Sequence, residues 1–420
     1  MKTPEAIAHD HMVTTRRYFL RLTAGSAVGL ALADRLWAAG DLDHPALLEA
    51  IEELIYLTPD EDFRYVGRLK PKASEMSEAD RAAAGITRDT WQLEIIADPD
   101  SEARLRHPMT KSAGTALSFD NLIQMGQTTA VRYLKVMTCN NIADPLGMGL
   151  WEGVPLRELI WKVEPDPKVR RVHYHGFHHD DPKWFFRSSL SINRVFEDPP
   201  GGQPVIVCYK LNGNWLSPDR GAPVRMIVPD AYGFKSVKWL RQIQLTTSHL
   251  NNDTYADKGN DVDSRMKTYA RILNWSENVP NGNAIPLTGI AQCGAAGLKK
   301  VQYWLKPKKD AWPAEDKYFQ TAPWIDAEIL PPPTENWDQI LDNNSLASTK
   351  NQFDQDGHAV AWPLRNTIAH FAALLTDVPK GEYEIRVRTI DENDIAQPLP
   401  RPFQKSGGNA IQQLPLLVEN

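Results

Sequence analysis

The sequence of 420 residues has little cysteine, no long apolar run and no excess of positive charge. Its three cysteines are an odd number, and no Cys-x-x-Cys motif occurs, which excludes a disulfide framework, a structural zinc site and a covalently attached c-type haem. No stretch approaches the roughly 20 apolar residues of a membrane-spanning helix. Because 53 acidic residues outnumber 47 basic ones, nucleic acid is not an expected partner.

Several common motifs are also missing. The sequence contains no Gly-x-Gly-x-x-Gly, Walker A, His-Glu-x-x-His or Gly-x-Ser-x-Gly pattern, which excludes the enzyme classes that carry them. What it does contain is 31 prolines and 13 tryptophans, which favour many short strands joined by loops over a helical bundle.

Residues 1–40 have the pattern of an export signal. Arg16-Arg17 is followed by Phe19-Leu20 and by an uncharged stretch over 22–33, which is too short to span a bilayer. Paired arginines in this position are typical of twin-arginine signals. We therefore expect cleavage after residue 33 or 40 and a periplasmic location. The alternative is a chance Arg-Arg pair before an N-terminal helix.

The remaining chain is predicted to be α+β, with two domains over 41–255 and 265–415. A polar connector over 249–264 separates them, and the polar stretch 331–360 is read as a long insertion. Apolar periodicity predicts helices over 44–57 and 155–160. The predicted strands are 91–95, 131–137, 204–209, 224–228, 237–245, 285–291, 299–305 and 382–390. Because the second domain is mostly strands, we expect it to be a β-sandwich.

Two stretches are candidates for chemistry. In the first, Cys139 follows a predicted strand and enters a turn rich in glycine and asparagine, which would direct its sulfur into a cleft. The second, residues 211–240, places glycines, arginines and lysines between short strands. Backbone donors combined with fixed cations suit a ligand that carries phosphate.

These two stretches resemble the sulfite oxidase family of molybdenum enzymes. The resemblance rests on Thr138-Cys139-Asn140 followed by Trp151-Glu152-Gly153-Val154-Pro155-Leu156, and on Asn212-Gly213 followed by Gly221-Ala222-Pro223-Val224-Arg225 and Val237-Lys238-Trp239. It covers about residues 55–415. It implies a sulfite-oxidase-type mixed domain that binds molybdopterin, followed by an Ig-like β-sandwich that forms a dimer.

The resemblance also implies roles for individual residues. Cys139 would be the thiolate ligand of molybdenum, since a soft anionic sulfur suits a redox metal held by a pterin dithiolene. Tyr209 would be a catalytic residue near the metal. The family's Arg-Asn-His near the N-terminus is absent, so Arg64 or Arg68 would serve as the substrate cation. Residues that would hold the pterin are Arg220, Arg225, Lys235 and Lys238.

The function implied is oxo transfer at molybdenum, with sulfite or a related sulfur compound as the small anionic substrate. Because this chain has no haem motif, electrons would pass to a separate c-type cytochrome. The protein would be a homodimer or a heterodimer with a cytochrome subunit. Alternatives are a sulfane dehydrogenase subunit, a reductase of sulfoxides or another oxyanion, and a secreted binding or scaffold protein without cofactor.

A histidine-rich segment has three possible interpretations. It contains His173, His175, His178 and His179, two of which share one face of a predicted strand. These histidines could be hydrogen-bonded or solvated side chains of an ordinary strand and loop. They could instead contact substrate at the mouth of the active site, or bind a separate metal. The other two cysteines, Cys208 and Cys293, are expected to be buried and inert.

Overall fold

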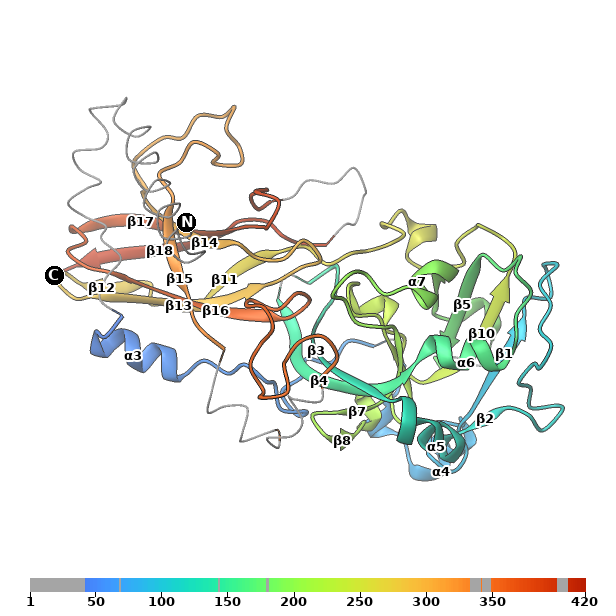
Figure 1. The fold of residues 1–420 in the computed structure, drawn as a ribbon. Helices are drawn as coiled ribbons and strands as arrows, with labels where there is room; N and C mark the ends of the chain where they lie inside the picture. The colour runs from blue at the N-terminus through green and yellow to red at the C-terminus, as the bar shows by residue number, and fades with distance from the viewer. Residues whose placement is uncertain are drawn as a thin grey trace, which may run out of the picture.

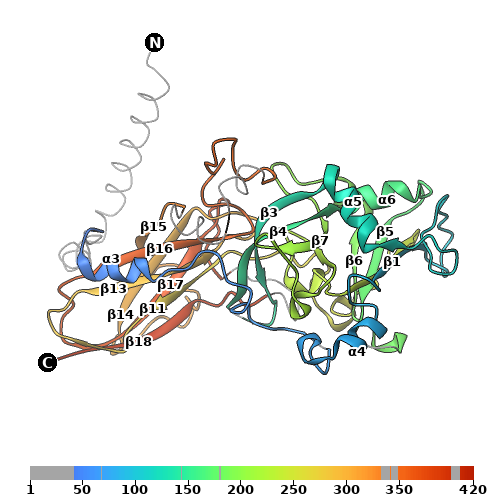
Figure 2. The same cartoon turned by 90° about the horizontal axis from the view of Figure 1, so that it is seen from below.

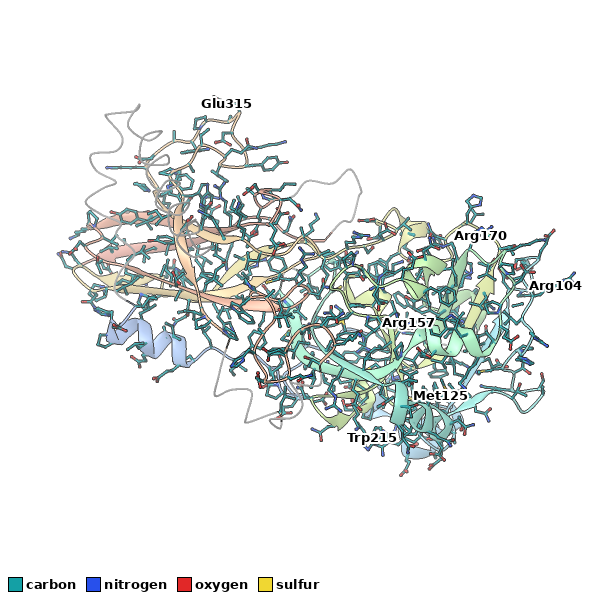
Figure 3. All side chains as sticks on the ribbon, viewed as in Figure 1. Arg104, Met125, Arg157, Arg170, Trp215 and Glu315 are labelled. Atoms are coloured by element: carbon teal, nitrogen blue, oxygen red, sulfur yellow. The ribbon has the colours of Figure 1, made fainter. Side chains whose placement is uncertain are left out.

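The computed structural model describes residues 42–67, 69–142, 144–178, 181–332, 341, 349–398 and 407–420. The proposed export signal, Arg68 and His179 lie outside these residues. Figure 1 shows two halves side by side, a mixed α/β half and a half built mainly of strands. Glu315 lies at the tip of a loop on the strand-rich half, and Arg104 lies at the opposite end of the molecule (Figure 3). No helix in the described part of the chain is long and apolar enough to cross a membrane.

The mixed half contains two five-stranded sheets. The first has the order β2-β1-β10-β5-β6, in which β1 and β10 run parallel. Its strands are β1 (Gln92–Ala97), β2 (Leu117–Ser118), β5 (Arg171–Gly176), β6 (Arg187–Ser191) and β10 (Leu240–Thr246). The second has the order β3-β4-β7-β8, with β9 paired to β7. Its strands are β3 (Val131–Thr138), β4 (Pro145–Pro155), β7 (Ile206–Leu211), β8 (Asn214–Trp215) and β9 (Arg225–Ile227).

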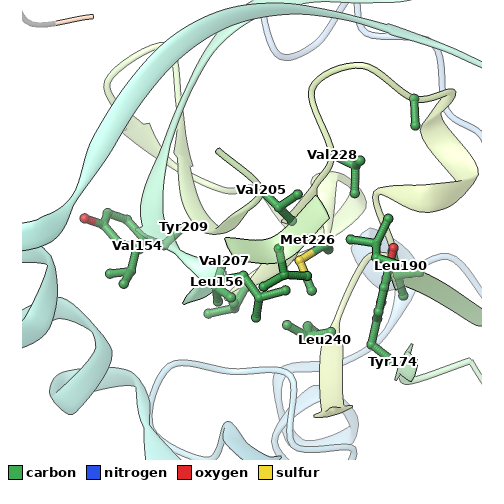
Figure 4. Packing of buried hydrophobic residues seen from close by; sticks show 14 of the residues in the cluster. Val154, Leu156, Tyr174, Leu190, Val205, Val207, Tyr209, Met226, Val228 and Leu240 are labelled. Carbon is green, nitrogen blue, oxygen red and sulfur yellow. The ribbon is translucent and has the colours of Figure 1, made fainter. Parts of the chain in front are cut away.

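Short helices cover these sheets and enclose one large apolar core. The helices are α4 (Glu78–Ala83), α5 (Phe119–Thr129), α6 (Leu156–Lys162) and α7 (Ile192–Phe196). Serine side chains cap three of them; in α5, Ser118 Oγ accepts a hydrogen bond from the Asn121 amide at 3.2 Å. Figure 4 shows Val207, Met226 and Leu240 packed together in the core. This burial fixes the strands whose ends carry the candidate site.

The second half is one eight-stranded sheet that folds over on itself. Its order is β11-β13-β16-β15-β14-β17-β18-β12. The strands are β11 (Tyr269–Asn274), β12 (Asn278–Pro280), β13 (Ile285–Gln292), β14 (Lys300–Pro307), β15 (Ile325–Ile329), β16 (Ile368–Leu375), β17 (Gly381–Ile390) and β18 (Gln412–Glu419). Because β15 pairs with both β14 and β16, it joins two layers around a second core. The predicted β-rich class is observed, and the Ig-like arrangement stays a prediction.

One helix packs on the outside of this sheet. Helix α3 (Pro45–Glu52) places Leu47 against Ala372 and Leu374 of β16 (Figures 1 and 2). The sequence predicted a longer helix over 44–57. The helix ends at Glu52, and Tyr56 instead packs beside Trp362 and His370 in the largest buried apolar cluster.

The outer face of β17 is covered rather than solvated. Its alternating pattern predicts that Arg386 and Arg388 point away from the core, and their side chains are nevertheless only 9% and 8% exposed. The loop between β14 and β15 lies over them, with Phe319 stacked 4.2 Å from Arg386 and Trp324 stacked 4.3 Å from Arg388. Trp324 therefore packs on the outer face of the sheet rather than in the core between its layers.

Strand β4 was not predicted from the sequence. The sequence predicts a turn rich in glycine and asparagine after Cys139, whereas Gly147, Gly149 and Gly153 lie within an eleven-residue strand, β4. A side chain at Gly153 would collide with the backbone of Val207 on the neighbouring β7, and one at Gly149 would collide with Leu211. These glycines thus permit close packing of the sheet rather than a reversal of the chain.

Residues from the second half complete the edge of the first. Strand β3 is an edge strand, and the amide of Gln352 binds its backbone: Oε1 accepts from the Leu134 amide at 2.6 Å and Nε2 donates to the Leu134 carbonyl at 2.8 Å. Val136 donates its amide to the carbonyl of Asn366 at 2.9 Å. The two halves are therefore joined through the strand that leads to Cys139.

Candidate active site

A single cleft brings together most of the side chains singled out in the sequence. It lies in the mixed half, and its empty space is about 810 Å³ including the open mouth. Its arginine, lysine and cysteine lining residues are Arg64, Cys139, Arg220, Arg225 and Lys238. These residues come from the N-terminal segment, the end of β3, the turn Pro218–Arg220, the start of β9 and the segment before β10.

Cys139 is held at the point where β3 ends. The β3–β4 pairing shifts register between Met137 and Thr138, so the chain leaves the sheet immediately before the cysteine. Its side chain is 8% exposed, and Sγ lies 4.0 Å from Oδ1 of Asn140. The side-chain amide of Asn140 in turn donates to Oδ1 of Asn260 at 2.8 Å. The thiol is thus free of a disulfide and reaches the cleft from a fixed backbone.

Arg225 is a buried cation of the cleft. It is 3% exposed and donates to the carbonyls of Arg220 at 2.9 Å and Ser236 at 2.7 Å. Its guanidinium also stacks 5.2 Å from the ring of Trp151. Burial lowers the pKa of Arg225 to about 10, and the charge of Arg220 acts in the same direction.

Arg220 and Lys238 lie beside it. Arg220 donates to the carbonyl of Phe63 at 2.9 Å, and Lys238 donates to the carbonyls of Val66 at 3.0 Å and Asp219 at 2.6 Å. Burial, followed by the charges of the two arginines, lowers the pKa of Lys238 well below its usual range. Gly221 allows this approach for two reasons. It adopts φ +103°, which favours glycine, and a Cβ atom on this residue would lie only 2.9 Å from Cβ of Lys238.

This cluster carries positive charge that its protein neighbours do not neutralise. Among the described residues, neither Arg225 nor Lys238 forms an ion pair with a carboxylate, and Arg220 has only Asp60 at 3.7 Å. The Nε atoms of Arg220 and Arg225 are buried and find no hydrogen-bond acceptor within the described chain. Both features favour an anionic ligand. Such a ligand would accept hydrogen bonds from the unpaired donors, and its negative charge would relieve repulsion among the three cations.

The structure places Lys235 outside this cleft lining. Its Nζ lies 2.7 Å from Oδ2 of Asp253 and 3.0 Å from the carbonyl of Ser189, and the pair is almost completely buried. Burial lowers the pKa of Lys235, while Asp253 raises it. The side chain is therefore occupied by protein partners, in contrast to Lys238.

Tyr209 also lies outside the lining. It is 4% exposed, its ring packs 5.8 Å from that of Trp215, and Figure 4 shows it at the edge of the core beside Val154. Burial raises its pKa, and Glu152 adds to this effect. Trp215 itself is on the surface of the molecule (Figure 3). Thus the tyrosine packs among apolar groups on β7 while the cations face the cleft.

The N-terminal arginines and the histidines are separated by the fold. Arg64 is exposed and lines the cleft, while Arg68 is outside the described residues. His178 lines the cleft, and His173 and His175 do not. His175 stacks on Phe185 at 4.4 Å, and burial lowers its pKa to about 4. Among the described residues, these histidines are not part of a group that could bind a metal.

Sequence reasoning missed the aromatic wall of the cleft. Phe186, Phe234 and Tyr255 pack edge-on or tilted against one another, with centroids 4.7 to 5.6 Å apart. Phe63 closes another side, at 6.0 Å from Trp151. These residues come from four distant parts of the chain, so no local pattern joins them. They form an apolar wall in the same cleft as the thiol and the cations.

Comparison with known proteins identifies the domain that holds this cleft. Residues 83–254 match the family model described as an oxidoreductase molybdopterin binding domain. A nitrate reductase (NADPH) from Beauveria bassiana is 34% identical over 110 residues, which cover 26% of this chain and 12% of that protein. A nitrate reductase (NADPH) from Fusarium oxysporum is 36% identical over 107 residues, covering 26% and 11%. The match therefore spans only about a tenth of the length of these curated relatives.

One solved structure resembles nearly the whole chain. It is the crystal structure of the sulfane dehydrogenase SoxCD from Paracoccus pantotrophus, with a TM-score of 0.55 and 16% sequence identity. The alignment covers 92% of this chain and 96% of that one. At this identity the likeness is one of fold, and it includes both halves of the molecule.

Proposed function

Because residues 83–254 belong to the oxidoreductase molybdopterin-binding domain family, we propose that this protein oxidises sulfite or a related sulfur compound at a molybdenum centre. The observation that carries the proposal is the cleft itself, in which the accessible edge of the Cys139 thiol shares one cavity with Arg220, Arg225 and Lys238. A soft sulfur ligand and a set of unneutralised donors are the two things that a metal-bound pterin phosphate requires.

The residues present fit this cofactor. Cys139 would supply a thiolate to the metal, and the guanidinium groups of Arg220 and Arg225 would bind the anionic end of the pterin, with Lys238 beside them. When bound, the cofactor supplies two-electron oxo transfer, which the protein side chains cannot perform by themselves.

The side chains of the cleft would then bind and shield the substrate. Arg64 is exposed at the cleft and would attract a small anion. Phe186, Phe234 and Tyr255 would exclude water and strengthen that attraction by lowering the local polarity.

A second candidate is oxidation of sulfane sulfur. It is supported by the likeness of fold to a sulfane dehydrogenase over 92% of the chain. It is also supported by the cleft. Arg64 is the one exposed cation among its described lining residues, and sulfite as a dianion favours several cations. In either case we propose periplasmic location, directed by the segment 14–33, and a separate c-type cytochrome as electron acceptor.

Metal analysis tests the proposal. Protein matured in a host that makes molybdopterin should hold about one molybdenum per chain, and Cys139→Ser should lose the bound metal or its activity. Cys293→Ser is the matched control, because this cysteine is also buried but lies in the strand-rich half. A molybdenum-free wild type would refute the proposal and favour the alternative of a binding or scaffold protein.

A substrate panel distinguishes the candidates. Sulfite-dependent reduction of ferricyanide supports the first, and activity with protein-bound sulfane sulfur but not sulfite supports the second. Activity only in the direction of nitrate or sulfoxide reduction, with an artificial electron donor, would assign the reductase alternative.

A further inference from the structure

Cys139 lies between two neighbours that are each hydrogen-bonded to a different part of the chain. On one side, the hydroxyl of Thr138 donates to Oε1 of Gln292, the last residue of β13 in the strand-rich half. On the other side, Nδ2 of Asn140 donates to Oδ1 of Asn260 in the connector at 2.8 Å. All four side chains are buried, with exposed fractions of 5% or less.

Both partners are themselves held in place. Gln292 Nε2 donates to the carbonyl of Lys267 at 2.8 Å, and Asn260 Nδ2 donates to the carbonyl of Tyr255 at 2.7 Å. The amides of Tyr255 and Ala256 donate to Oδ1 of Asp253 at 2.8 and 3.1 Å. Asp253 is the partner of the buried Lys235. A continuous hydrogen-bonded path therefore runs from Lys235 to the residue next to the cysteine.

We propose that Gln292 and Asn260 are positioning residues for Cys139, and that Lys235 acts through Asp253 to anchor the second of them. This inference rests on the proposed function for the role of Cys139 as metal ligand. The register shift at the end of β3 leaves the cysteine without regular pairing, so its position depends on its neighbours. A metal ligand must be held within a fraction of an ångström, and buried hydrogen bonds to adjacent groups are the usual means.

In this proposal, the strand-rich half helps to position Cys139. Gln292 belongs to a sheet outside the matched molybdopterin-binding region. The same loop is held from this sheet a second time, by Arg271 Nε, 3.4 Å from Oδ1 of Asp144. The second half thus contributes directly to the geometry at the thiol.

The test uses the metal-free full-length protein and the rate at which iodoacetamide alkylates Cys139, followed by peptide mass spectrometry. Thr138→Val removes one hydrogen bond by replacing the hydroxyl with a methyl group, and Asn260→Ala removes the other. Each should accelerate alkylation of Cys139 by about fivefold or more, because the thiol gains freedom and access. Thr138→Ser keeps the hydroxyl and should restore a rate close to that of the wild type.

Two controls separate positioning from loss of stability. Gln397→Ala removes a buried, hydrogen-bonded glutamine of the same half that does not contact residues 138–140. Cys208, buried in β7, reports global opening in every sample. Faster alkylation of Cys139 alone supports the inference. Unchanged Cys139 rates in both variants, a parallel rise at Cys208, or an equal rise in Gln397→Ala would overturn it.

The outcome is independent of the proposed function, because alkylation is measured without metal. If the positioning role is correct and Cys139 is a metal ligand, Thr138→Val should also bind less molybdenum than Thr138→Ser. If wild-type protein binds none, the proposed function fails while the alkylation result still decides the positioning role.

Discussion

Buried basic side chains are the most unusual residues of this protein, and they fall into two groups. Arg225 and Lys238 line the cleft and have no carboxylate partner among the described residues, which suits an anionic ligand. Lys135 is fully buried on β3 and donates to the carbonyls of Val136 at 2.7 Å and Ala231 at 3.3 Å. Burial lowers the pKa of Lys135 to about 7.

Replacement of this lysine should change how stability depends on pH. Between pH 7 and about 10, the amine is neutral in the folded state and protonated in the unfolded chain, so its contribution to the unfolding free energy rises with pH. We expect the difference, wild type minus Lys135→Met, to increase by up to about 1.4 kcal/mol per pH unit over this window. Urea denaturation at several pH values measures it.

The exposed Lys309 provides a matched control for that experiment. Lys309→Met should leave the pH dependence of the wild type unchanged. A Lys135→Met difference that stays constant from pH 7 to pH 10 would show that the buried amine keeps its ordinary titration.

At the scale of elements, β3 is the strand through which the two halves of the molecule are joined. It lies at the edge of its sheet, and an open edge would expose unpaired backbone groups. Residues that follow the polar stretch 331–348 close that edge, through Gln352 and through the carbonyl of Asn366. The sequence predicted a long polar insertion over 331–360, and Gln352 within it binds the backbone of β3.

Loss of the Gln352 amide should therefore destabilise the protein. Gln352→Ala leaves the buried amide and carbonyl of Leu134 without partners, and each such group costs about 1–3 kcal/mol. The variant should have a lower urea midpoint. Gln413→Ala, at an exposed position on β18, is the control and should differ little from the wild type. Equal midpoints for the two variants would contradict this account.

At the scale of the whole molecule, side chains from both halves hold the backbone around the cleft in place. Hydrogen bonds from β13, from the connector and from the segment 349–366 all converge on β3 and the residues that follow it. The chain has a formal net charge of −6, so its surface favours basic partners.

This charge leads to a prediction about the proposed electron transfer. Reduction of a basic c-type cytochrome should slow by about tenfold or more between 0.01 and 0.1 M salt, since the Debye length falls from about 30 to 10 Å. With ferricyanide, an anion, the rate should stay constant or rise. Stopped-flow measurement with the same substrate checks both, and a salt-independent cytochrome rate would argue against electrostatic docking.

The sequence by itself determined much of the local structure and the chemistry of the site. The sequence correctly indicated β1, β3, β13, β14 and β17. For β1 and β17 the signal was alternation of apolar residues, because a strand that buries one face imposes a period of two. The motifs around Cys139, Arg225 and Lys238 pointed to a molybdopterin-binding oxidoreductase domain, which the family match confirms. Local chain geometry is sufficient for the first conclusion, whereas the second depends on the resemblance of these motifs to a known family.

Only the tertiary structure decided how distant residues combine. It separated Lys238, which faces the cleft, from Lys235, which is paired with Asp253, although both lie in one short motif. It also brought Gln292 and Asn260 to the neighbours of Cys139 from 154 and 120 positions along the chain. Such contacts are set by the packing of whole sheets, since no local spacing encodes which buried donor will meet which acceptor.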